Sequence, residues 1–270
     1  MNIKYEKIRD KLKIDCEACS GLCCVALYCS KTDGFPADKE AGTPCRHLES
    51  NYSCNIHSEL LDRNYKGCIT YDCFGAGQKT TQLFKDVTWD ENPNEKYNIF
   101  AIFLILFQLH QMLWYLIEAS TLTSDETLLV RIDKLMKEYE QMLQQPIIDM
   151  LKLDLDEYRD KVNTVLKQIR NAISGQKSNQ TNKGTYFGKN FHKANLDKRD
   201  FSMSLMIAAN LEGCSLKQTS FLGADMRDAN LCNADLSESV FLTQMQINSA
   251  KGNSITKIPY YLSRPISWEI

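Results

Sequence analysis

A five-residue period runs from about residue 189 to residue 243 and constrains the fold more than any other feature of the sequence. Eleven consecutive units place an apolar side chain at their centre, namely Phe191, Leu196, Phe201, Met206, Leu211, Leu216, Phe221, Met226, Leu231, Leu236 and Phe241. Two positions earlier, the later units carry only small side chains: Ser204, Ala209, Cys214, Thr219, Ala224, Ala229, Ala234 and Ser239. Helices repeat about every 3.6 residues and strands about every 2, so this period indicates a solenoid of stacked coils.

Units such as Ala194-Asn195-Leu196, Ala224-Asp225-Met226 and Ala229-Asn230-Leu231 resemble the A(D/N)LXX pattern of the pentapeptide-repeat family. The resemblance implies a right-handed quadrilateral β-helix with four units per coil. We expect the central side chain and the small side chain before it to point inward, which predicts a buried Cys214 and an outward Cys232. Lys189 and Arg199 occupy small-residue positions and are assigned to an irregular first coil, where long side chains reach solvent.

The repeat stretch is short and nearly neutral. Its 55 residues make a little under three coils, so the stack is only about 13 Å tall at the usual strand spacing. Some pentapeptide-repeat proteins imitate duplex DNA and protect type II topoisomerases, which calls for a long acidic rod. Here six basic side chains nearly balance seven acidic ones. The sequence therefore disfavours a DNA mimic and favours a scaffold whose faces bind a partner protein.

A helix is predicted after the last unit. Thr243-Gln244-Met245-Gln246 has the spacing of a capping box, which predicts a short helix from about Thr243 to Ala250 over the end of the stack. Lys251-Gly252 is expected to end it, because glycine favours the left-handed conformation at a helix terminus. The tail through Pro259, Pro265 and Trp268 is expected to pack irregularly alongside the coils.

Length and composition bound the remaining classes. A chain of 270 residues accommodates two domains, and a net charge of −2 disfavours a general nucleic-acid binder. The charged N-terminus lacks the apolar core of a signal peptide. The longest apolar run, Ile99 to Phe107, is too short for a membrane span of about 20 residues and predicts a buried helix. We therefore expect a cytoplasmic protein without a membrane segment.

Cysteines are concentrated near the N-terminus: nine of eleven lie between Cys16 and Cys73. In a reducing compartment such a group indicates metal ligands or redox groups more often than disulfides. The stretch from Cys16 to Gln78 resembles a family of zinc- or iron-chelating domains with a CxxCxxxCC signature, which implies metal binding but no particular reaction. The predicted ligands are Cys16, Cys19, Cys23, Cys24, Cys45, Cys54, Cys68, Cys73 and His57, with zinc favoured and iron or an iron–sulfur cluster as the alternative.

Several neighbours of these cysteines receive plainer interpretations. Adjacent Cys23 and Cys24 point in different directions, so they serve two ions or leave one thiol free. Cys29 is predicted to be a buried or free thiol, and His47 an exposed loop residue. Asp72 either orients a ligand or is solvated, and solvation is favoured. Gly75 and Gly77 are expected to allow a tight turn after Cys73.

The middle of the chain has helical periodicity. Pro93 to Ala119 is apolar nearly all round, and Thr123 and Asp154 each begin a capping-box spacing for a further helix. His110, on the apolar helix, is interpreted as a satisfied buried histidine rather than a ligand. The predicted organisation is α+β: a cysteine-rich module (1–80), a helical segment packing on it (81–174), a linker (175–184), the β-helix of about three coils (185–243) and a capping helix with tail (244–270).

Three functional hypotheses remain open at this stage. The first is a cytoplasmic metal-binding protein whose repeat domain is a scaffold for a partner. The second is a metalloenzyme whose iron or zinc keeps an open coordination position, with His57 or His110 contributing. The third is target protection by the solenoid. No nucleophile–base pair, phosphate loop or paired-carboxylate motif supports a specific reaction.

Overall fold

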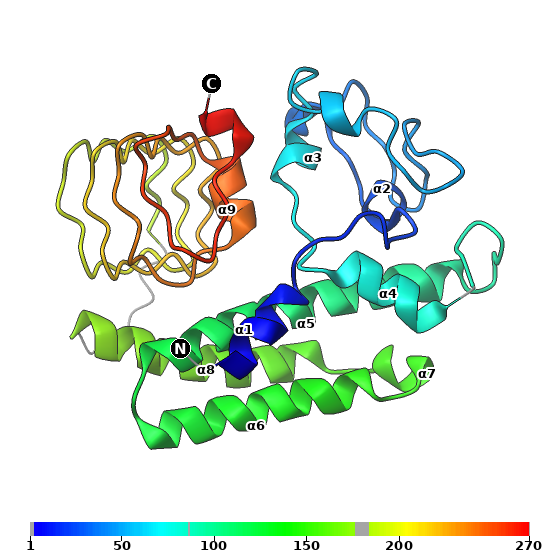
Figure 1. The fold of residues 1–270 in the computed structure, drawn as a ribbon, viewed down its shortest axis with the longest axis horizontal. Coiled ribbons are helices and arrows are strands. Elements are labelled where there is room, and N and C mark those ends of the chain that lie inside the picture. The colour runs from blue at the N-terminus through cyan, green and yellow to red at the C-terminus, as the bar shows by residue number, and fades with distance from the viewer. Residues whose placement is uncertain (1–2, 86, 176–183, 270) are drawn as a thin grey trace. The chain divides into compact units, whose positions relative to one another are not determined.

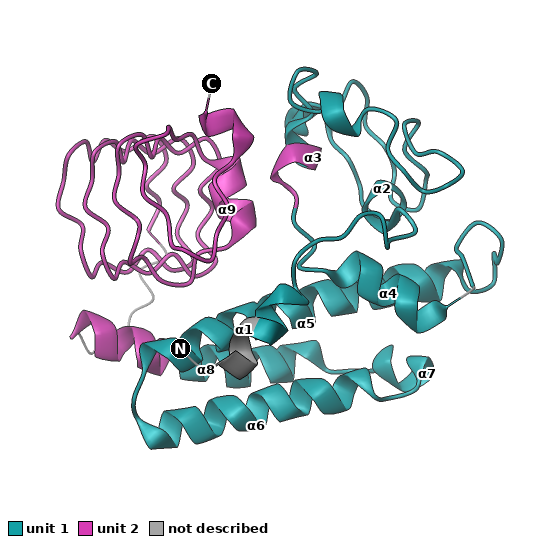
Figure 2. Ribbon diagram, viewed as in Figure 1, with its two compact units in different colours: residues 1–67, 72–166 teal, residues 68–71, 167–270 magenta. Residues whose placement is uncertain are grey.

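The structure, a computed structural model, describes residues 3–85, 87–175 and 184–269 (Figure 1). It divides into two compact units (Figure 2). One comprises Met1–Gly67 and Asp72–Leu166, and the other comprises Cys68–Tyr71 and Lys167–Ile270. Most of the predicted linker, residues 176–183, lies outside the described residues.

One long helix organises the first unit. Helix α5 (Lys96–Leu122) is apolar nearly all round and packs against α1 (Ile3–Asp10), α2 (Leu22–Ala26), α4 (Ala76–Phe84), α6 (Glu126–Leu143) and α7 (Ile147–Met150). A helix surrounded in this way buries most of its faces, as the all-round apolar sequence predicts. Ile102, Phe103, Leu106 and Leu109 are completely buried.

Helices α6 and α8 (Leu155–Ser174) each bury one apolar stripe, and they are joined where the Tyr158 hydroxyl donates to the Leu135 carbonyl at 2.9 Å. Asp154 caps α8, since its carboxylate accepts from the backbone N–H groups of Asp156 and Glu157. The N-cap of α6 is Asp125 rather than the predicted Thr123. Thr123 instead accepts from the Asp125 N–H, so it lies just outside the helix.

Helix α5 is also the one described helix that is long and apolar enough to cross a membrane by length and composition. This is weak evidence for a membrane span, because 67% of its most apolar window is buried within the protein. The buried helix predicted from the run Ile99 to Phe107 is therefore present.

The cysteine-bearing part of the first unit is mostly loop, with α2 and the short 3-10 helices η1 (Lys31–Asp33) and η2 (His57–Glu59). Its last residues begin α3 (Lys66–Thr70), from which Cys68 onward groups with the other unit. Two antiparallel bridges, Cys29 with Lys39 and Leu48 with Cys54, pin these loops. The Lys39 ammonium adds a polar centre by donating to the carbonyls of Leu27 (2.6 Å) and Thr43 (2.9 Å).

Stacked coils form most of the second unit (Figure 1). Parallel bridges join residues 20 positions apart, for example Asn190 with Asn210 and Asn210 with Asn230. Each coil therefore holds four five-residue units. Among the described residues these contacts are isolated bridges, and no longer strand is formed.

The inward positions match the sequence pattern. Of the eleven central side chains, all but Phe191 are buried, and so are all eight small side chains two positions earlier. Cys214 is buried and its thiol donates to the Phe191 carbonyl at 3.0 Å, whereas Cys232 is half-buried. Lys189 and Arg199 are exposed in the first coil, as predicted. Lys189 lies over the rings of Tyr186 and Phe191.

Ten successive corners have a left-handed backbone, at the second position after each centre: Gly188, Lys193, Lys198, Met203, Ala208, Gly213, Gln218, Gly223, Asp228 and Asn233. Such a conformation favours glycine and asparagine, yet six of these corners carry other side chains. The repeat geometry therefore overrides the local preference of the chain.

The C-terminal helix α9 (Gln244–Ser249) has the predicted capping box between Thr243 and Gln246. It ends at Ala250 as predicted, but not through a left-handed glycine: Ala250 is the C-cap in an extended conformation, and Gly252 does not have a positive φ. Gly252 is needed for a different reason, because a Cβ there would lie 2.5 Å from the ring of Trp268. The tail bridges to the coils through Lys251 and Lys257 and ends in η3 (Ile266–Trp268).

Candidate metal centre

The first unit brings most of the N-terminal cysteines together. All eleven cysteines are free thiols. Cys68 lies exposed on α3, in the segment that groups with the other unit. His57 is exposed on η2. The candidate centre therefore consists of cysteines of the first unit.

Cys19 and Cys73 converge on the first turn of α4. A Cβ built on Gly77 would lie 2.7 Å from the Cys19 sulfur and 3.8 Å from the Cys73 sulfur. Gly77 is helical and has no positive φ, so no backbone strain requires glycine here. Its missing side chain instead leaves room for the Cys19 sulfur, and the Cys73 sulfur lies at ordinary contact distance from the same position although the two cysteines are 54 residues apart in the sequence. The prediction that Gly77 serves a tight turn is corrected, while Gly75, with φ 72°, does make that turn.

The Cys16–Cys19 loop is tied to α4 on both sides. Gln78 accepts from the Asp15 N–H and donates to the Lys13 carbonyl at 2.6 Å. Further along, the Thr81 hydroxyl accepts from the Ser20 N–H at 3.0 Å. One helix therefore fixes the segments that flank both predicted ligands of the loop.

Backbone N–H groups point at several of the sulfurs. Burial raises the pKa of Cys19, which precedes α2, and backbone hydrogen bonding from Gly21 and Leu22 partly offsets that rise, as Gly77 does for Cys73, three residues before α4. These bonds lower the pKa of each thiol, because they stabilise the thiolate. Cys54 accepts similarly from the Ile56 N–H, and Cys45 from the His47 N–H at 3.5 Å. N–H groups placed around sulfur in this way are suited to thiolate ligands.

Burial raises the pKa of these thiols by more than the N–H groups lower it. It raises the pKa of Cys16 to about 11 and that of Cys73 to about 12, with smaller contributions from neighbouring thiols and from Asp72. Cys16 and Cys73 are therefore protonated at neutral pH in the absence of a cation. A bound cation would offset both the burial and the mutual repulsion of the thiolates.

Cys23 lies at the middle of the group. Its sulfur is 4.0 Å from that of Cys24, and this contact is the largest cause of its strongly raised pKa. Burial is the largest cause of the raised pKa of five other cysteines, but the Cys23 thiol contributes to every one of them: Cys16, Cys19, Cys29, Cys54 and Cys73. Cys29, predicted to stand apart, thus lies within electrostatic reach of the group.

The thiols surround a common region without standing at ligand distances. Among the described residues, no three His, Cys, Asp or Glu side chains form a ready metal-binding group. The N–H groups and the space at Gly77 nevertheless suit a thiolate-bound ion, because structural zinc sites take four such ligands. Binding would require small movements of the sulfur atoms toward one another.

The surroundings of Asp72 and the hydrogen bonds of His47 and His110 differ in part from those predicted. His47 uses both ring nitrogens, with Asn55 at 3.2 Å on one side and the Tyr65 hydroxyl at 3.0 Å on the other. Asp72, favoured as solvated, is in fact buried and accepts from the Phe74 N–H at 2.7 Å. His110 is buried as predicted, but only its Nδ1 has a partner. The Asp72 contact is local, since it joins residues two apart, whereas the local sequence shows no signal for the contact of His110, which joins α5 to a residue 36 positions earlier.

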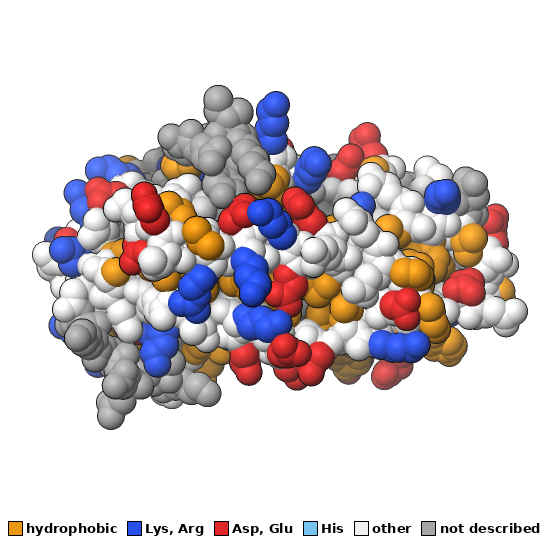
Figure 3. Space-filling model, turned by 90° about the horizontal axis from the view of Figure 1, so that it is seen from below, with side chains coloured by type: hydrophobic (Ala, Val, Ile, Leu, Met, Phe, Trp, Pro, Cys, Tyr) orange, Lys and Arg blue, Asp and Glu red, His pale blue; other side chains and the backbone are white. Residues whose placement is uncertain are grey.

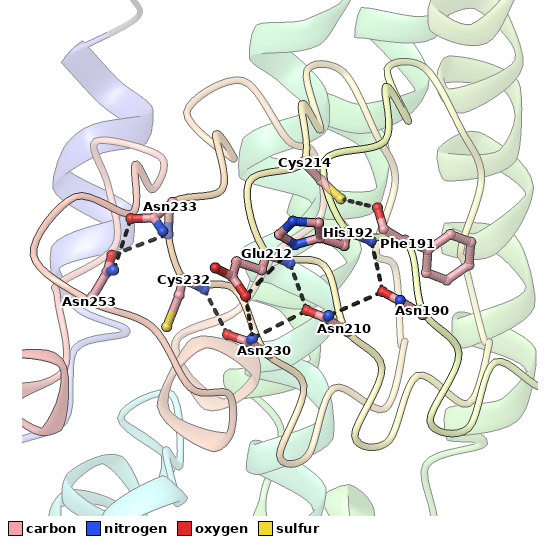
Figure 4. Close-up of polar contacts among 10 residues, drawn as sticks. All are labelled: Asn190, Phe191, His192, Asn210, Glu212, Cys214, Asn230, Cys232, Asn233 and Asn253. Carbon is pink, nitrogen blue, oxygen red and sulfur yellow. Dashed lines mark hydrogen bonds and ion pairs between the residues drawn. The ribbon is translucent and has the colours of Figure 1, made fainter.

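The repeat coils present a second candidate surface (Figure 4). On one face the side-chain amides of Asn190, Asn210 and Asn230 form a ladder of hydrogen bonds at 3.1 and 3.2 Å. Beside it stand His192, Glu212 and Cys232, one from each successive coil, and His192 lies 3.8 Å from the Glu212 carboxylate. This face is polar and regular, and its side chains are at least partly exposed.

Acidic side chains of the coils are paired. Asp225 contacts Arg227, Asp228 contacts Lys251, and Asp235 contacts Lys257, each within 3.5 Å. Figure 3 shows a face of the molecule on which Lys and Arg side chains lie next to Asp and Glu side chains. A DNA mimic needs a continuous negative surface, which these pairs interrupt.

Comparison with known proteins gives two findings. Residues 204–241 match pentapeptide repeats in eight copies. The chain is also 38% identical over 286 residues to "Uncharacterized protein YybG" of Bacillus subtilis (strain 168), in an alignment that covers 98% of each protein. The similarity therefore includes the cysteine-bearing unit as well as the repeats.

Proposed function

We propose that this chain, which belongs to the pentapeptide-repeat proteins and over its whole length to one family with YybG, is a cytoplasmic metal-binding protein with a repeat scaffold for a partner protein. Its N-terminal unit would hold zinc, or alternatively iron, through cysteine thiolates. The observation that carries this proposal is the convergence of Cys19 and Cys73 at Gly77, with N–H groups aimed at both sulfurs.

The primary site is assigned to Cys16, Cys19, Cys23 and Cys73. After burial, the Cys19 and Cys23 thiols both contribute to the raised pKa of Cys16 and of Cys73. Cys16 and Cys19 come from the loop before α2, Cys23 from α2 itself, and Cys73 from the turn before α4. Cys24, Cys45 and Cys54 are assigned to a second group, because the Cys45 thiol raises the pKa of Cys54 and the Cys45 N–H bonds the Cys24 carbonyl at 2.9 Å. His57 and Cys68 remain proposed ligands from the sequence pattern alone.

Zinc is preferred for the primary site. A bound zinc ion would cross-link the loop segments of a region with little regular secondary structure, and it would hold the thiols as thiolates. We assign to the repeat coils the right-handed quadrilateral β-helix. Four units per coil and parallel bridges 20 residues apart support that assignment.

Metal analysis tests the proposal. Full-length protein purified without oxygen is expected to carry at least about one zinc or iron per chain. Cys19→Ser and Cys73→Ser should lose most of it, whereas Cys232→Ser, on the repeat coils, should retain it. Zinc without a visible absorption band supports a structural site, while iron with charge-transfer bands favours the metalloenzyme alternative. Wild-type protein without bound metal would overturn the metal proposal.

The scaffold proposal has its own test. A photo-reactive residue introduced at Glu212, on the face of Figure 4, is expected to cross-link one specific protein in cells. The same residue at Lys137, on the exposed side of α6, serves as the control. If positions on the repeat coils capture nothing beyond this control, the scaffold role is wrong.

A further inference from the structure

The turn that carries Cys73 has an unusual backbone. Phe74 has φ 49° and Gly75 has φ 72°, so two consecutive residues adopt the left-handed conformation directly before α4. For phenylalanine this conformation is unfavourable and persists only when the surroundings impose it. The position of the Cys73 sulfur depends on this turn, because Cys73 is the residue immediately before it.

Both polar groups of Phe74 are held by buried side chains. Its N–H donates to the Asp72 carboxylate at 2.7 Å, and its carbonyl accepts from His110 Nδ1 at 2.6 Å. Only 3% of His110 is exposed, and its Nε2 has no partner. Because a carbonyl can only accept, the Nδ1 atom carries a proton and donates it to Phe74. The one hydrogen bond of this buried histidine therefore holds the Phe74 carbonyl in the turn that follows Cys73.

The side chain of Phe74 is anchored to the same helix. Its ring is almost completely buried and packs against Phe107 and Trp114 of α5, with ring centroids 5.9 and 5.8 Å apart. His110 lies on α5 between these two aromatic residues in the sequence. Helix α5 thus contacts Phe74 both at its ring and at its carbonyl oxygen.

We infer that His110 is a positioning residue for the metal centre: through the Phe74 carbonyl it holds the Cys73 sulfur toward the Cys19 sulfur at Gly77. This inference rests on the proposed metal-binding function. Asp72 holds the preceding peptide unit through the Phe74 N–H, and together the two contacts fix both sides of the left-handed Phe74. Outer partners of metal ligands typically change metal affinity by about 10- to 100-fold when they are removed.

The test compares three substitutions that differ in one donor. His110→Asn places an amide N–H near the position of Nδ1 and should preserve the bond to Phe74. His110→Gln keeps a polar side chain but places its amide near Nε2, and His110→Leu removes the donor while filling the space. Zinc affinity is measured by competition with a chromophoric chelator. We expect a loss of about 10- to 100-fold for Gln and Leu and near wild-type affinity for Asn.

Two further measurements separate positioning from a general loss of stability. With cobalt(II) in place of zinc, loss of Cys73 as a ligand should reduce the sulfur-to-cobalt charge-transfer absorption by about one quarter for Gln and Leu only. In metal-free protein, amide hydrogen exchange at residues 73–77 should be faster for Gln and Leu than for Asn and wild type.

Each outcome is decisive. Equal zinc affinity and equal cobalt spectra in all four proteins would overturn the positioning role while leaving the metal proposal intact. A loss that is the same for Asn and Leu would also overturn it, because the bond to Phe74 would then not be the cause. Wild-type protein that binds no zinc would overturn the proposed function itself.

Discussion

Gly77 shows at the scale of a single residue how a missing side chain shapes the candidate centre. Within a helix, glycine is less favourable than alanine by about 1 kcal/mol. At Gly77, however, a methyl group would lie 2.7 Å from the Cys19 sulfur. Local helix propensity and the geometry of the thiols therefore favour opposite residues at this position.

Gly77→Ala is expected to weaken zinc binding although it strengthens the helix. The Cys19 sulfur must move away from the added methyl group, so zinc affinity should fall by about 10- to 100-fold, as for other disturbances around metal ligands. Gln82→Ala, at an exposed position of the same helix, should leave affinity unchanged. Competition with a chelator measures both variants, and unchanged affinity in Gly77→Ala would contradict the proposed convergence of the two thiols.

His110 predicts a pH dependence of stability. Burial lowers its pKa from 6.5 to about 4. As pH falls below about 6.5, His110 takes up a proton in the unfolded chain, whereas in the folded chain it stays neutral until about pH 4. The free energy of unfolding therefore decreases across this window by about 3 kcal/mol. Above pH 6.5 the full stability is present.

Denaturant unfolding of metal-free protein at several pH values checks this expectation. His110→Asn lacks a titrating group, so its stability should fall less than that of the wild type between pH 6.5 and 4. Identical pH profiles for the two proteins would show that His110 is not neutral and buried as described.

At the scale of the element, the repeat coil imposes its backbone on its side chains. The ten left-handed corners carry lysine, methionine, alanine and glutamine as well as glycine and asparagine. A left-handed conformation costs an ordinary residue roughly 1–2 kcal/mol. The coils tolerate this cost because each unit buries its centre and its small side chain against neighbouring coils.

Ala208→Gly is therefore expected to stabilise the repeats. Ala208 is an exposed corner with φ 55°, so glycine removes strain and loses little packing. Its conformational freedom in the unfolded chain offsets part of the gain, which leaves about 0.5–1 kcal/mol. Ala234→Gly, at a buried inward position without positive φ, should destabilise instead. Thermal unfolding compares the two, and destabilisation by both substitutions would refute the strain at the corner.

At the scale of the whole molecule, two hydrophobic cores are stabilised in different ways. The first unit packs around α5 and contains the thiol group, whereas the second packs the inward side chains of its coils. A metal that binds only the folded first unit would stabilise that unit by mass action.

Removal of metal is accordingly expected to affect the two cores unequally. With a strong chelator under reducing conditions, the unfolding transition of the first unit should move to lower temperature, while that of the repeat coils should not change. Intrinsic fluorescence follows the first unit through Trp89 and Trp114, and Trp268 reports on the second. Transitions that shift together would contradict this separation.

The sequence predicted the features that repeat or cluster along the chain. The five-residue period identified the inward positions, since a repeat imposes one environment on every unit. The spacing of Thr243 and Gln246 predicted the capping box of α9. The helical periodicity located α5, α6 and α8 within a few residues, but not the N-cap of α6, because Thr123 and Asp125 are both good caps and only packing chooses between them.

Contacts between distant segments were accessible only from the tertiary structure. The sequence alone determined a repeat solenoid, a mainly helical middle and a concentration of thiols, because periodicity and composition are local properties of the chain. The tertiary structure decided that Gly77 makes room for the Cys19 sulfur and that His110 holds the Phe74 carbonyl. Each of these depends on which side chains α4 and α5 bring together across tens of residues, and no local pattern encodes that choice.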